Sequence, residues 1–171
     1  MASVMEALTH LQTSTSSDSI EQAQRAVATA RSYQLNDELQ RIPQLNTLIQ
    51  MVDICCSLLD HDVNQSSQKL AVLQDLMDEK LNEPNWRADG SFSIPLNGRS
   101  IGPSSMDTGN ILQVQNGSLL LSFNWLPQHD LYALCYFLSS VTLCSRNSYD
   151  GRKAEKFLEE GLHMVKGGFL L

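Results

Sequence analysis

Histidine, aspartate and glutamate, the side chains that most often bind metals, are spread along this 171-residue chain rather than clustered. No HExxH motif and no pair of histidines at i, i+4 spacing is present, so a zinc site on a helix is not indicated. The run Asp60-His61-Asp62 lies between two predicted helices, where such residues cap helix ends. His129-Asp130 opens another predicted helix, whose dipole the aspartate complements. We therefore predict no metal site and no cofactor.

Acid–base and nucleophilic chemistry is not indicated either. The adjacent acidic pairs Asp78-Glu79 and Glu159-Glu160 lie in predicted helices, where neighbours in sequence do not face one another. The sequence contains neither a GxSxG nucleophile motif nor a phosphate-binding loop of the Walker A type. We predict that the protein is not an enzyme and has no catalytic residues. The alternative is an activity carried by residues 84–122.

The four cysteines form no metal-ligand spacing and no CxxC pair. They all fall within apolar helical segments: Cys55, Cys56, Cys135 and Cys144. We predict buried, reduced thiols that act as small apolar residues, which is typical of a protein inside the cell.

The charge of the chain argues against two kinds of partner. The formal net charge is −7 and the pI is about 4.9, and no basic stripe is present. An acidic chain gains nothing from counterion release on DNA or RNA. No apolar run approaches the roughly 18 to 20 residues of a membrane-spanning helix, and no secretory signal opens the chain. We predict no direct contact with nucleic acid and none with a membrane.

Apolar spacing predicts helices over the first half of the chain. We expect a short helix over 1–11 and a second over 18–33, with Asp18 as its N-cap. Pro43 marks the start of a helical hairpin over 44–60 and 65–82. The first helix of this hairpin has the pattern of an amphipathic helix. Its apolar stripe is Leu45, Leu48, Ile49, Val52, Cys56 and Leu59, and its polar stripe is Asn46, Gln50, Asp53 and Ser57.

Residues 84–110 are rich in Gly and Pro and show no helical period, which indicates a long irregular connection. Beyond it, β-forming residues flank Asn116-Gly117, the typical turn of a tight hairpin. We predict a small β-hairpin over 111–123. It would have to lie against the helices, because an isolated hairpin is marginally stable.

The last part of the chain predicts a second helical hairpin, with helices over 127–145 and 152–167. The first of these helices is apolar on nearly every side, so we expect it to be packed between its own partner and a neighbouring pair. A shift of 85 residues lays this hairpin on the hairpin 44–82 with matching apolar positions. Such matching favours a helical repeat.

The sequence thus predicts an all-α fold in which antiparallel helix pairs stack as a tetratricopeptide-like superhelix. Residues 1–83 are expected to form helical repeats, with a partial first hairpin before the hairpin 44–82. Residues 84–122 form an irregular insert with the β-hairpin 111–123. Residues 123–171 form a truncated helical hairpin.

Two groups of residues in this last segment are candidates for a role. Tyr132, Tyr136 and Ser139 could line the concave surface of a helical array and bind a partner there, with core packing as the alternative. Trp125, Leu126 and Pro127 are predicted to form the structural junction at which the insert returns to the helices.

The segment 123–167, FNWLPQHDLYALCYFLSSVTLCSRNSYDGRKAEKFLEEGLHMVKG, resembles the family of tetratricopeptide-repeat (small) subunits of the cohesin loading complex. In that family a Trp-Leu-Pro opens a long apolar helix, as residues 125–127 do here. The family's second helix has the pattern found here in Lys153-Ala154-Glu155-Lys156-Phe157, followed by Leu162. Residues 18–83 are similar to the family in helix length and order, and 84–122 is similar to the variable insert of its fungal branch.

The resemblance implies a non-enzymatic scaffold. Proteins of this family bind the N-terminal arm of the large HEAT-repeat subunit of the cohesin loader. The complex acts in the nucleus, where it loads cohesin onto chromatin and supports sister chromatid cohesion. Because family members are several times longer, the resemblance also implies that this chain is a fragment. The alternative is another intracellular helical-repeat scaffold for protein–protein interactions.

Overall fold

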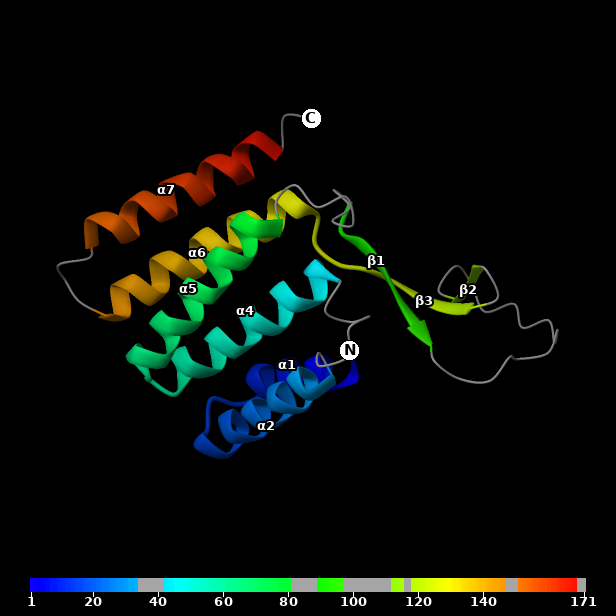
Figure 1. The fold of residues 1–171 in the computed structure, drawn as a ribbon. Coiled ribbons are helices and arrows are strands. Elements are labelled where there is room, and N and C mark those ends of the chain that lie inside the picture. Colours follow the sequence, from blue (N-terminus) through cyan, green and yellow to red (C-terminus); the bar gives the residue numbers. More distant parts are fainter. Residues whose placement is uncertain (34–41, 81–88, 97–111, 116–117, 147–150, 169–171) are drawn as a thin grey trace.

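A computed structural model of the chain shows stacked pairs of antiparallel helices (Figure 1). The pairs are α1 (Ala2–Thr13) with α2 (Ser17–Tyr33), α4 (Pro43–Leu59) with α5 (Val63–Lys80), and α6 (Gln128–Arg146) with α7 (Gly151–Gly168). The structure describes residues 1–33, 42–80, 89–96, 112–115, 118–146 and 151–168. The predicted all-α fold of stacked helix pairs with a small β-structure is confirmed.

The first pair is held by small side chains on α2. Ala23, Ala26, Val27 and Ala30 are all buried. The predicted N-cap is wrong by two residues, because the backbone N–H of Ser19 donates to the hydroxyl of Ser16 at 3.3 Å. Asp18 lies instead in the first turn of α2, where its charge still complements the helix dipole.

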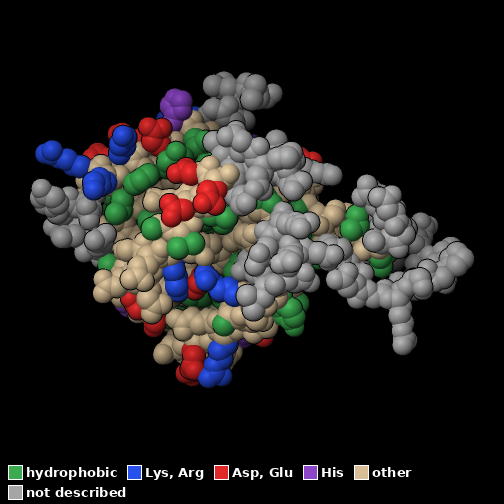
Figure 2. All heavy atoms as spheres, viewed as in Figure 1, with side chains coloured by type: hydrophobic (Ala, Val, Ile, Leu, Met, Phe, Trp, Pro, Cys, Tyr) green, Lys and Arg blue, Asp and Glu red, His purple; other side chains and the backbone are tan. Residues whose placement is uncertain are grey.

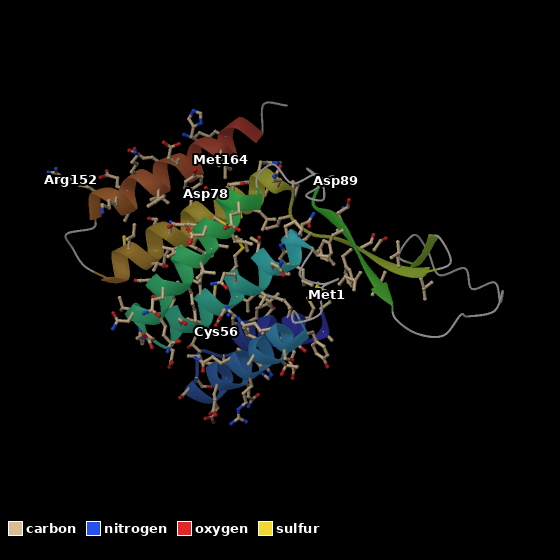
Figure 3. The ribbon with its side chains drawn as sticks, viewed as in Figure 1. Met1, Cys56, Asp78, Asp89, Arg152 and Met164 are labelled. Carbon is tan, nitrogen blue, oxygen red and sulfur yellow. The ribbon has the colours of Figure 1, made fainter. Side chains whose placement is uncertain are left out.

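Helix α4 is the centre of the stack, since it packs against α1, α2, α5 and α6. One side of α4 belongs to a first core cluster that it shares with α1, α2 and β1, and Cys56 lies on the side that faces α2 (Figure 3). Its other side belongs to a second core cluster, in which Met51 and Ile54 meet α5 and α6. Apolar contacts therefore hold α4 from two opposite directions.

Three of the four residues in the polar stripe of α4 are buried rather than facing solvent. Gln50, Asp53 and Ser57 are each 7% exposed or less. The Asp53 carboxylate pairs with the guanidinium of Arg31 on α2, and it accepts a hydrogen bond from Lys69 Nζ on α5 at 2.7 Å. Lys69 also donates to Ser57 Oγ at 2.6 Å, and Arg31 donates to Gln50 Oε1 at 2.7 Å. Burial of this stripe is tolerated because its polar atoms find partners on the neighbouring helices.

A three-stranded antiparallel sheet extends from the end of the stack at which α4 and α6 begin (Figure 1). Its strands are β1 (Ser91–Leu96), β2 (Leu112–Gln115) and β3 (Ser118–Asn124), in the order β1-β3-β2. The pairing of β2 with β3 confirms the predicted hairpin, whose turn Asn116-Gly117 lies outside the described residues. The sheet is anchored to the first core cluster by Phe92, which is buried and stacks on Phe123 with ring centroids 5.5 Å apart.

Strand β1 lies in the segment that we predicted to be irregular. It pairs with β3 over its whole length, from Ser91 opposite Asn124 to Leu96 opposite Leu119. The sequence did not predict this strand because Pro95 interrupts its pattern. An edge strand accommodates such a residue because the missing N–H can point away from the ladder.

Helix α6 packs against other helices on two sides. Leu131, Cys135 and Leu138 pack into the second core cluster against α4 and α5. The prediction that this helix packs between its own partner and a neighbouring pair is confirmed, because α6 contacts α7 as well as α4 and α5. Its apolar side chains are not all buried, since Phe137 is 51% exposed and Cys144 is also exposed. Helix α7 adjoins α6 on another side, and the described residues leave the face around Phe137 open.

Candidate functional site

An apolar groove lies between α6 and α7 and has a volume of about 420 Å³. Phe137 of α6 and Leu158 and Leu162 of α7 are each about half exposed in this region. The lining residues are Leu126, Asp130, Ala133, Leu134, Phe137, Leu158, Gly161, Leu162 and Val165. Large apolar side chains that are exposed together mark a surface for binding rather than for solvation.

Small residues on α7 determine the shape of this groove. Ala154 is 1% exposed, and Gly161 is buried against α6. A Cβ atom at Gly161 would lie 3.1 Å from Tyr136 Cβ and 3.3 Å from the carbonyl oxygen of Ala133, so only glycine fits this contact without displacement. The backbones of α6 and α7 therefore approach closely, and Leu158 and Leu162 stand beside the contact instead of filling it.

One charged side chain, Asp130, lines the otherwise apolar groove. It lies in the first turn of α6, where the helix dipole favours a negative charge. Its carboxylate oxygen Oδ1 is 3.1 Å from Nε2 of the preceding His129, and both side chains are partly exposed. The groove thus offers a carboxylate at the end where α6 begins.

Tyr132 lies on a different side of α6 from the groove. Its ring packs against the second core cluster, and its hydroxyl donates a hydrogen bond to the carbonyl oxygen of Met77 at 3.2 Å. Burial, with smaller contributions from the nearby Cys135 and Asp78, raises the pKa of Tyr132 to about 12. Figure 2 shows acidic side chains grouped in the part of the surface where Figure 3 labels Asp78.

Tyr136 and Ser139 also make contacts between helices of this chain. The Tyr136 ring packs on Phe157 of α7, with centroids 6.0 Å apart. Ser139 is 2% exposed, donates to the carbonyl oxygen of Cys135 at 2.8 Å and accepts from Gln74 Nε2 at 3.2 Å. The buried Ser139 hydroxyl is therefore not accessible in this arrangement. A partner role for the exposed parts of Tyr132 and Tyr136 stays a prediction.

Trp125, Leu126 and Pro127 connect the end of β3 with the start of α6. Trp125 packs against both core clusters, and Leu126 packs against the second and lines the groove. The carbonyl oxygen of Pro127 accepts a hydrogen bond from the N–H of Leu131 at 3.1 Å, which begins the first turn of α6. Contact with both clusters is the geometry that the predicted junction requires.

The backbone of Gly90 fixes this connection from the side of β1. Its carbonyl oxygen accepts a hydrogen bond from the N–H of Trp125 at 3.1 Å. Gly90 has a φ of +75°, and a Cβ atom there would lie only 2.3 Å from the carbonyl oxygen of Leu126. Glycine is required on both counts, by the left-handed backbone and by the close approach. The sequence signal for this residue was weak, because Asp89-Gly90 resembles an ordinary turn.

Some of the side chains that could carry chemistry have structural roles instead. Asp62 accepts hydrogen bonds from the backbone N–H of Gln65 at 2.9 Å and from its side chain at 2.8 Å, which confirms the predicted capping role of this run. All four cysteines are free thiols. Cys56 and Cys135 are buried, and burial raises the pKa of each thiol to about 12. The prediction of a buried thiol is wrong for Cys144, which is exposed.

The described part of the chain lacks two further kinds of site. No group of three or more His, Cys, Asp and Glu side chains there is arranged to hold a metal ion. Among the helices that the structure describes, none combines the length and the apolar character needed to cross a membrane. The groove between α6 and α7 is therefore the candidate binding surface of the described residues.

Comparisons with known proteins point to one family. Neither a curated protein nor a solved structure matches the chain. The family model described as cohesin loading factor, in contrast, matches residues 1–169, which is almost the whole length. The match covers the described helix pairs and the sheet, and it agrees with the resemblance seen in residues 123–167. The chain therefore belongs to the cohesin loading factor family.

Proposed function

We propose that this protein is a non-enzymatic scaffold subunit of the cohesin loader. In this role it binds the N-terminal arm of the large HEAT-repeat subunit and so supports cohesin loading onto chromatin and sister chromatid cohesion. The observation that carries the proposal is the family match over residues 1–169. A role in the nucleus, on chromatin, follows from this function.

The architecture supports a scaffolding role. Stacked helix pairs present extended surfaces to partners, and this stack carries an open apolar groove at α6 and α7. The acidic net charge of −7 suits a subunit that binds another protein while other subunits contact DNA. Among the side chains considered for chemistry, Asp62 caps α5, and Cys56 and Cys135 lie in the core.

The proposal is tested by mixing the purified protein with the purified large subunit and measuring association by isothermal titration calorimetry. We expect a stable complex, because a scaffold that recruits a partner in the cell must bind it at cellular concentrations. Absence of association at micromolar concentrations of both proteins would contradict the proposal.

A further inference from the structure

We draw no further inference here: the strongest candidate, the apolar groove between α6 and α7 lined by Phe137, Leu158 and Leu162, carries none because nothing in the described part of the structure shows what covers it.

Discussion

Helices α4 and α6 open successive helix pairs, and their first residues, Pro43 and Gln128, are 85 positions apart (128 − 43). Helix α4 has a polar stripe in its sequence, yet neighbouring helices cover α4 on several sides. α6 is apolar on nearly every side, yet one of its faces is open. At matching positions, Val52 of α4 is 3% exposed and Phe137 of α6 is 51% exposed.

The contrast shows that neighbours in the stack, rather than the composition of the helix, decide which faces are buried. α4 lies between α2 and α5, whose Arg31 and Lys69 neutralise Asp53 and so allow its polar stripe to be enclosed. The open face of α6 has no such neighbour among the described residues. Its apolar side chains are then available for binding.

The largest expected effect comes from the polar contact that encloses α4. Asp53→Ala should lower the free energy of unfolding by about 4 kcal/mol, because it leaves Arg31 and Lys69 without their partly buried counter-ion. Glu21→Ala is the matched control, since Glu21 pairs with Arg25 on the exposed surface of α2 and should cost less than about 1 kcal/mol. Urea denaturation measures both, and equal losses would mean that the stripe is solvated.

The two faces of α6 should respond differently to the same kind of truncation. Leu131→Ala, in the second core cluster, should cost about 3 kcal/mol through the cavity that it leaves. Phe137→Ala removes a larger side chain from the open face and should cost less than about 1 kcal/mol. A larger cost for Phe137→Ala in urea denaturation would show that its face is covered in the free protein.

Trp125 joins the two regions, so its truncation tests how firmly they are coupled. Trp125→Ala should cost about 2 kcal/mol, which is less than for a fully buried tryptophan because the ring is partly exposed. Part of the loss is offset, because the indole N–H is buried and finds no hydrogen-bond partner among the described residues. Unchanged stability would contradict the junction role.

The helices were predictable because their apolar spacing is local. The capping by Asp62 and the β2–β3 hairpin both follow from residues close in sequence. The burial of Asp53 was not predictable in this way, since its partners Arg31 and Lys69 lie 22 and 16 residues away on other helices. Strand β1 was missed because its partner β3 is distant and its own pattern is interrupted by a proline.

The groove was missed for a related reason. The spacing of Leu158, Leu162 and Val165 predicts an apolar face on α7. This spacing does not reveal whether that face packs against α6 or is exposed. The sequence did contain a usable signal, because the apolar stripe of α7 is wider than one helix contact needs. Ala154 and Gly161 already form the contact with α6, so the larger apolar residues beside them are not needed for it. The residues that we predicted to bind a partner, Tyr132 and Tyr136, instead pack against other helices of the stack.

Hydroxyl-radical footprinting of the protein tests the central claim most directly. We predict that Phe137 and Leu162 are oxidised readily, as the exposed Val72 is, while the buried Val52 and Leu131 are protected. Protection of Phe137 and Leu162 to the same degree as Val52 would contradict the account.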